Sequence, residues 1–285
     1  MANRPNGIAI DPTTDTMYVA NGDSNTVSVM NTKTNRILSN ISVGDTPNDV
    51  EINTVDNVLY VANIHSNTVS VIDTLTNKVI SNTQVGVSPA TISEDPNDEF
   101  LFTTNRDSGT VSIIKTENYE SIRNITVGIS PIGVAVNAIT HTLYVVNSGS
   151  NNISIINYYS KTGHLFSLSE AKSKTIRVGE TPYAIVINAV TNTIYVSNAG
   201  ANTISVIDGK TNSVVKTIPV GMAPIHLAVN PVANMIYVAN NHDNTVSVID
   251  GNTNNVVKNV IVGYYPYGIA INPNTNLADC LRFPD

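Results

Sequence analysis

The segment PIHLAVNPVANMIYVANNHDNTVSVIDGNTNNVVKNVIVG, from Pro224 to Gly263, decides the fold of this chain. It contains four short apolar runs, at Leu227–Asn230, Met235–Asn240, Thr245–Asp250 and Val256–Gly263, which are rich in Val, Ile, Thr and Tyr. Runs of this length and composition are typical of β-strands, and Thr-Val-Ser-Val-Ile follows the two-residue period of a strand. The segment therefore predicts four short antiparallel strands.

The same four-strand phrase recurs along the chain. Its leading proline returns every 42 residues, with one interval of 51, at Pro5, Pro47, Pro89, Pro131, Pro182, Pro224 and Pro266. A repeat of this period with four strands per unit predicts the blade of a β-propeller, an all-β fold whose blades surround a central channel. Six repeats are complete, and a seventh begins at Pro266 and stops at Asn276.

The repeat count leaves two ways to close the ring. We expect a single propeller domain over residues 1–276 and a non-repeat tail over residues 277–285. Six four-stranded blades are favoured, and a truncated seven-bladed ring or a fragment of a longer array is the alternative. In a six-bladed ring the strands at Gly7–Ile10 and Gly268–Ile271 compete for one innermost place. We therefore expect the second to pack beside the first unit and the tail to be poorly ordered.

A motif in the second strand of each unit carries a family resemblance. The strand reads Tyr-Val-x-Asn in most units, and Val-Gly-x-x-Pro and Val-Ser-Val-Ile-Asp accompany it. Its instances are Tyr18–Asn21, Tyr60–Asn63, Phe102–Asn105, Tyr144–Asn147, Tyr195–Asn198 and Tyr237–Asn240. These motifs resemble the YVTN family of β-propeller repeats over nearly the whole chain. The resemblance implies a propeller of a kind prominent in archaeal cell-surface and surface-layer proteins, and it brings no catalytic motif.

The recurring residues have expected structural roles. The Tyr side chain is expected to lie between blades, with its hydroxyl reaching a polar partner. The Asn that ends the second strand is expected to bond its own backbone and start the turn. A glycine lies three residues before each repeat proline from Pro47 onward, as Gly128 lies before Pro131, and is expected to let the backbone turn from an outer strand to the next inner strand.

Composition excludes several classes of function. The net charge is −7 with only 15 Lys and Arg, and no basic cluster could follow a phosphate backbone, so nucleic-acid binding is excluded. No run of 18 apolar residues predicts a membrane span. The repeat starts almost at Met1, so we expect either a cytoplasmic protein or a sequence that starts downstream of a leader that has been removed. The family resemblance favours an extracellular or cell-surface location, and the single Cys280 cannot form an internal disulfide.

Three ionisable residues stand out where the channel is expected. The second and fourth residues after each proline should face the axis, and they are small in most units. Asp49, Glu51 and His226 occupy such places instead, and they are the catalytic candidates of the chain. Two carboxylates two residues apart on a strand point the same way, and with a histidine they could bind a divalent cation or transfer protons. The alternative is that a wet channel tolerates polar side chains. No resident cofactor and no metal-ligand spacing is recognised.

The residues around each repeat proline vary most between units. The candidate binding residues on this loop face are Asn48, Tyr183, Ile225, Tyr264, Tyr265 and Tyr267. Variation on a constant scaffold and enrichment in Tyr are typical of recognition loops, although neutral drift at loop tips gives the same pattern. A nine-residue insertion in the fourth unit, between Tyr158 and Lys174, is expected on the opposite face, as a contact element or a tolerated insertion.

The sequence thus carries two hypotheses of function. No hydrolase, metalloprotease, nucleotide-binding or dinucleotide-binding motif is found. We therefore expect a non-catalytic binding or structural propeller, secreted or at the cell surface, that recognises a protein or glycan through its loop face. The alternative is a propeller enzyme, a lyase or hydrolase, that uses Asp49, Glu51 and His226 with or without a divalent cation.

Overall fold

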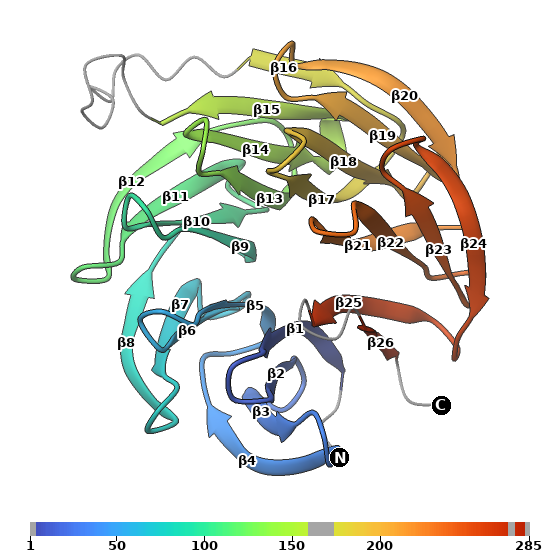
Figure 1. The fold of residues 1–285 in the computed structure, drawn as a ribbon. Helices are drawn as coiled ribbons and strands as arrows, with labels where there is room; N and C mark the ends of the chain where they lie inside the picture. The colour runs from blue at the N-terminus through green and yellow to red at the C-terminus, as the bar shows by residue number, and fades with distance from the viewer. Residues whose placement is uncertain (1–3, 159–173, 273–276, 283–285) are drawn as a thin grey trace.

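A computed structural model describes residues 4–158, 174–272 and 277–282 of the chain. Figure 1 shows strands arranged as blades around a common centre, which confirms the all-β propeller. The described residues form six four-stranded antiparallel sheets, as expected, and one two-stranded sheet. A single short 3-10 turn, η1 (Ser148–Ser150), interrupts this pattern in the described part of the chain. None of the described helices is long and apolar enough to cross a membrane.

The first three blades follow the first three repeats. The first blade is β1 (Pro5–Asp11), β2 (Thr16–Asn21), β3 (Thr26–Asn31) and β4 (Arg36–Ser42). The second is β5 (Pro47–Asn53), β6 (Val58–Asn63), β7 (Thr68–Asp73) and β8 (Lys78–Gln84). The third is β9 (Pro89–Asp95), β10 (Phe100–Asn105), β11 (Thr110–Lys115) and β12 (Glu120–Thr126).

The next three blades repeat the same order. The fourth is β13 (Pro131–Asn137), β14 (Thr142–Asn147), β15 (Asn152–Asn157) and β16 (Lys174–Arg177). The fifth is β17 (Pro182–Asn188), β18 (Thr193–Asn198), β19 (Thr203–Asp208) and β20 (Ser213–Pro219). The sixth is β21 (Pro224–Asn230), β22 (Met235–Asn240), β23 (Thr245–Asp250) and β24 (Asn255–Ile261). Most of the insertion of the fourth unit, residues 159–173, lies outside the described residues.

The partial seventh repeat has a place of its own in the ring. It forms β25 (Pro266–Asn272) and β26 (Leu277–Arg282), and β25 contacts both β21 and β1 (Figure 1). β25 therefore packs beside the first unit, as expected, without displacing β1 from its innermost position. β26 pairs with β25 as β2 pairs with β1, so residues 277–282 form a strand where a non-repeat tail was expected. The pairing is possible because β25 leaves a free edge that backbone groups of any sequence can satisfy.

The tyrosine of the second strand packs between blades, as expected. Tyr60, Tyr144 and Tyr195 are at most 1% exposed. Each hydroxyl donates a hydrogen bond to the following blade, such as that from Tyr144 to Asn212 Oδ1 at 3.0 Å. These side chains and the Val, Ile and Leu around them fill the spaces between adjacent sheets. The core of this fold therefore lies between blades.

The Asn and Gly that recur in the repeat units have different roles from those expected. Asn147 donates from Nδ2 to Ser154 Oγ at 2.9 Å on the third strand, and its Oδ1 accepts the Gly128 N–H of the preceding blade at 3.0 Å. A Cβ on Gly128 would lie 2.5 Å from Asn147 Cγ. Gly128 is therefore needed for close approach, since its backbone is not left-handed. The left-handed residue of this turn is Ser130, directly before Pro131, with φ of 50°.

Candidate functional site

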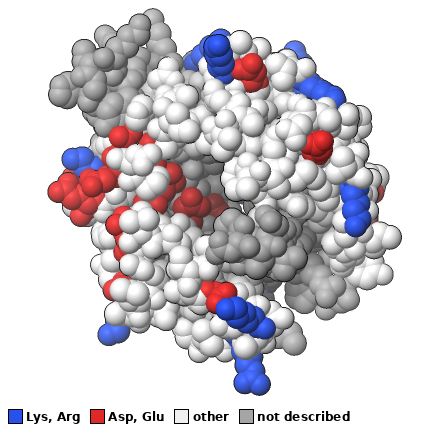
Figure 2. Space-filling view, viewed as in Figure 1, with Lys and Arg blue, Asp and Glu red and all other residues white. Residues whose placement is uncertain are grey.

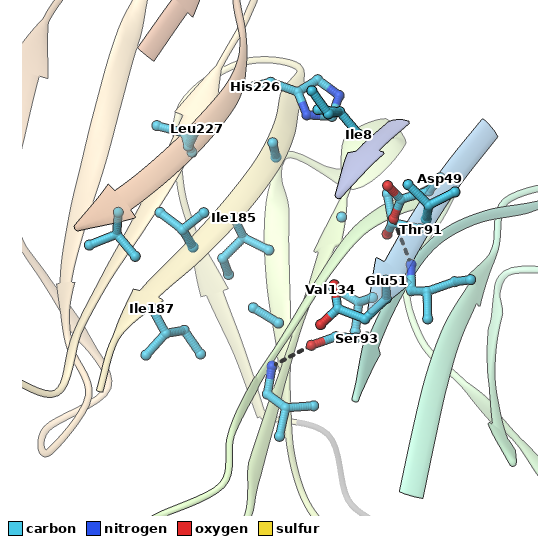
Figure 3. A pocket seen from close by; sticks show the side chains of 18 residues that line it. Ile8, Asp49, Glu51, Thr91, Ser93, Val134, Ile185, Ile187, His226 and Leu227 are labelled. Atoms are coloured by element: carbon cyan, nitrogen blue, oxygen red, sulfur yellow. Dashed lines mark hydrogen bonds between the residues drawn. The ribbon is translucent and has the colours of Figure 1, made fainter. Parts of the chain in front are cut away.

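The central channel contains a cavity of about 350 Å³. Its walls come from the inner strands β1, β5, β9, β13, β17 and β21. Figure 3 shows Asp49, Glu51, Thr91 and Ser93 on one side, contributed by β5 and β9. The opposite side is aliphatic, with side chains such as those of Ile185, Ile187 and Leu227 from β17 and β21. The cavity thus has one polar wall and one apolar wall.

The polar side chains of this cavity join neighbouring blades. Asp49 Oδ2 accepts the backbone N–H of Ile92 at 2.9 Å, and Ser93 Oγ accepts that of Val136 at 3.2 Å (Figure 3). Glu51 receives the corresponding backbone N–H of Glu94. Each acceptor lies 43 residues before its donor, one position more than the repeat. Inner strands are sheet edges with unpaired N–H groups, so a polar residue on one blade satisfies the edge of the next.

Burial changes the acidity of both channel carboxylates. Burial raises the pKa of Asp49 to about 6, although the hydrogen bond from the Ile92 N–H acts in the opposite direction by favouring the ionised form. Burial, followed by the charges of Asp49 and Glu94, raises the pKa of Glu51 to about 8. Both side chains keep some contact with water in the channel, but the surrounding blades remove most of their hydration. At neutral pH, Asp49 is therefore largely ionised and Glu51 carries a proton.

His226 lines the same cavity but belongs to an aromatic cluster. Its ring centroid lies 5.9 Å from that of Tyr183 and 5.1 Å from that of Tyr267. The two tyrosine hydroxyls share a hydrogen bond of 2.6 Å. Burial lowers the pKa of His226 to about 4 and raises the pKa values of both tyrosines, so all three are neutral at pH 7. Among the residues described, no hydrogen bond or ion pair joins His226 to the channel carboxylates.

The loop face carries an exposed aromatic patch, which we define as Met222, His242, Tyr264 and Tyr265. Tyr264 and Tyr265 are 62% and 54% exposed, and Met222 is 50% exposed. The Tyr265 ring meets the His242 ring edge-on, with centroids 6.5 Å apart. Tyr265 has a φ of 48°, and its N–H donates to Asn244 Oδ1 at 2.9 Å. A left-handed conformation is unusual for so bulky a residue, and here the turn fixes the backbone from which the ring projects.

The other candidate binding residues lie deeper. Tyr183 and Tyr267 form the aromatic cluster with His226 in the channel. Asn48 is half-buried and donates from Nδ2 to the Ala90 carbonyl at 2.7 Å, across a blade boundary. Ile225 is only 8% exposed. The residue after each proline sits at a register shift of the inner strand, and such a bulge turns its side chain inward.

Two further features were not expected from the sequence. A cavity of about 490 Å³ lies between the loop that joins β10 to β11 and the loop that joins β12 to β13. Arg106–Gly109 and Thr126–Ser130 line it. Near the other end of the inner strands, ligand atoms of Asp95, Asp98 and His141 lie within 4.8 Å of one another. His141 Nδ1 is 2.6 Å from Asp98 Oδ2, and Tyr158 donates its hydroxyl proton to Asp95. Figure 2 shows acidic side chains gathered over the second and third blades, at the left of the view.

This acidic group has a structural counterpart in the neighbouring blades. Asn137 bonds Asn192 at 2.9 Å and Asn188 bonds Asn234 at 2.7 Å, at the positions that Asp95 and His141 occupy one blade earlier. The group thus replaces an Asn–Asn contact between blades. Aligning the repeats shows that Asp95 and His141 match Asn137 and Asn192. The sequence does not show that Asp95 and His141 lie close together, because they are 46 positions apart.

Comparisons with known proteins support the fold. A family model described as "Lactonase, 7-bladed beta-propeller" matches residues 134–257, which is less than half of the chain. Hydrazine synthase of Kuenenia stuttgartiensis is similar with a TM-score of 0.82 and 18% identity, over 98% of this chain and 95% of that one. A functionally unknown protein from Desulfotomaculum acetoxidans DSM 771 is similar with a TM-score of 0.77 and 16% identity, over 93% and 89% of the two chains. No curated protein matches the sequence. At these identities the likeness establishes a propeller fold.

Proposed function

We propose that this chain is a non-catalytic binding propeller that recognises a partner through the aromatic patch of its loop face. The observation that carries the proposal is the exposure of Tyr264 and Tyr265, at 62% and 54%, on a turn whose backbone is fixed. Rigid tyrosine rings supply large contact areas at a low cost in conformational entropy. Asp49 and Glu51 each accept a backbone N–H from the next blade, so both have a structural role that requires no substrate.

A protein partner fits the patch best. Tyr and Met are enriched in the centres of protein interfaces, where charged residues are depleted. Met222 belongs to this patch through His242, whose N–H donates to the Met222 carbonyl at 3.2 Å and whose ring meets that of Tyr265. A glycan is the other ligand that exposed rings in a chain rich in amide side chains could hold. We place the protein outside the cell or at its surface, on the resemblance of its repeat to surface-layer propellers. Labelling of intact cells with an impermeant reagent tests that location.

The binding role is tested by changing both tyrosines to alanine. Ala223 already occupies the left-handed position equivalent to Tyr265, so Tyr265→Ala suits the turn. We expect wild-type protein to bind a defined subset of a protein or glycan array, and Tyr264→Ala/Tyr265→Ala to lose at least about tenfold in affinity. Val232→Ala is the matched control, since Val232 is 86% exposed in a turn between β21 and β22, away from the patch. Equal binding by all three proteins would refute the patch as the recognition surface.

A propeller hydrolase is the second candidate function. It is favoured by the partial match to a lactonase model and by Glu51, whose pKa near 8 would let it act as a general acid at neutral pH. The matched residues 134–257 contain His226 but not Asp49 or Glu51. A panel of γ- and δ-lactones provides the test. Ring opening that Glu51→Gln abolishes, with binding to the arrays absent, would favour the enzyme over the binding protein.

A further inference from the structure

The channel cavity is a second potential binding site, separate from the aromatic patch. Its volume of about 350 Å³ falls within the range of small-molecule pockets, roughly 300–1,000 Å³. Its two walls differ in chemistry, with carboxylates and hydroxyls on β5 and β9 and aliphatic side chains on β17 and β21 (Figure 3). A ligand that satisfies both walls must therefore be charged or polar at one end and apolar at the other.

Among the residues that the structure describes, no Lys, Arg or His pairs with the carboxylates of the polar wall. The charges nearest to Glu51 are those of Asp49 and of Glu94, which is bonded to Asn53 and Tyr60 outside the cavity. All the ion pairs found among the described residues lie elsewhere. Asp49 uses Oδ2 for the Ile92 N–H, whereas a carboxylate can accept several hydrogen bonds through both oxygens. A carboxylate buried without a cation is costly, so the wall favours a ligand that brings positive charge.

The geometry points away from a metal ion. Calcium takes six to eight oxygen ligands, and magnesium demands a near-octahedral set. In the described part of the chain, three metal-ligating groups converge within 4.8 Å at Asp95, Asp98 and His141, and no such group includes Asp49 or Glu51. The wall opposite the carboxylates offers CH groups of Val186 and Leu227 rather than oxygen. An inorganic cation would make no use of this aliphatic wall, because CH groups cannot coordinate a metal ion.

We propose that the channel binds a small organic ammonium ion, whose charged nitrogen faces Asp49 and Glu51 and whose apolar body packs on Val186 and Leu227. An ammonium group donates three hydrogen bonds, enough for both carboxylates and a neighbouring hydroxyl such as that of Ser93. The small inner residue Ala184 leaves room on the apolar side. No covalent step is involved, and the site is independent of the proposed role of the loop face.

Binding should also release a proton. The titratable groups around Glu51 are Asp49 on the same strand, Glu94 on β9, Tyr60 on β6 and His226 across the channel. Because Glu51 is protonated at pH 7, a bound cation draws it into the carboxylate form, while neutral His226 and Tyr60 do not change state. Affinity should therefore increase from pH 6 to pH 8 and level off above the pKa of Glu51.

Isothermal titration calorimetry with phenethylammonium tests the proposal, with 2-phenylethanol as the neutral analogue and Ca²⁺ as the inorganic cation. We expect one phenethylammonium to bind per chain, at least about tenfold more tightly than 2-phenylethanol. Glu51→Gln should fold normally, since Gln resembles the protonated side chain, and should lose about tenfold in affinity together with the pH dependence. Val186→Thr, which keeps the shape of the wall, should weaken binding about threefold or more.

Controls separate this result from loss of fold and from surface effects. Glu180→Gln removes an exposed loop carboxylate and should bind like wild type. Thermal unfolding of each variant checks that the ring is intact. Equal affinity for 2-phenylethanol, unchanged binding by Glu51→Gln, tighter binding of Ca²⁺ than of phenethylammonium, or no binding of phenethylammonium at pH 8 would each overturn the proposal.

Discussion

The contact between Gly128 and Asn147 allows the blade-to-blade packing to be tested quantitatively. In Gly128→Ala the new Cβ would lie 2.5 Å from Asn147 Cγ and 2.7 Å from its Cβ, well inside van der Waals contact. Asn147 is fully buried, and its amide holds Ser154 Oγ at 2.9 Å and Asn152 Oδ1 at 2.8 Å. Moving this side chain therefore adds strain and breaks buried hydrogen bonds.

The expected magnitude follows from those two effects. Overpacking costs about 1–3 kcal/mol, and a buried hydrogen bond left unsatisfied costs about 1–3 kcal/mol. We therefore expect Gly128→Ala to lower the free energy of unfolding by about 2–6 kcal/mol, which urea titration followed by circular dichroism measures. In an Asn147→Gly background the obstacle is gone, and the same change should cost less than about 1 kcal/mol. An equal cost in both backgrounds would show that Gly128 is required by its backbone conformation, and the reasoning would be wrong.

Three further predictions concern the channel and the turns. Because the pKa of Glu51 is raised from 4.5 to about 8, the folded state binds more protons than the unfolded state in this interval. Stability should therefore fall as the pH rises from about 5 to 8, and Glu51→Gln should flatten that slope in urea titrations; an unchanged slope would contradict the burial of Glu51. The pKa of His226 is lowered from 6.5 to about 4, so stability should fall as the pH drops through this range, and His226→Phe should remove this loss in acid-unfolding experiments. Ser130 has a left-handed backbone with φ of 50°, so Ser130→Gly should leave thermal stability equal or higher and Ser130→Val should lower it by about 1–2 kcal/mol; tolerance of Val would contradict the conformation.

The architecture could be predicted from the sequence because the same four-strand pattern recurs in every complete repeat. The period-two runs between Pro224 and Gly263 indicate four strands, and the buried Tyr60, Tyr144 and Tyr195 lie between blades as their amphipathic rings suggest. Sequence reasoning assigned the wrong cause to Gly128, because close approach across a blade boundary leaves no local pattern. It also missed the strand β26, whose pairing depends on the free edge of β25 rather than on repeat motifs.

The candidate sites were predicted in part, for a similar reason. Alternation along the inner strand correctly placed Asp49, Glu51 and His226 at one cavity, since side chains two residues apart share a face. It could not show that His226 would contact Tyr183 and Tyr267 instead of the carboxylates, because the curvature of the ring sets distances across the channel. The bonds that use residues 43 positions apart, such as Asp49 to Ile92, become visible only once the blades are assembled.

Photo-crosslinking at Tyr264 tests the proposed recognition surface most directly. A photoreactive benzoylphenylalanine replaces Tyr264, at 62% exposure, in one protein and the more exposed Val232, at 86% exposure, in a second. Both proteins are irradiated in the cells that produce them, and the crosslinked products are identified by mass spectrometry. We predict one recurrent partner crosslinked from position 264 and absent from position 232, with its yield reduced when Tyr265→Ala is added. The same products from both positions, or none from position 264, would contradict recognition through the loop face.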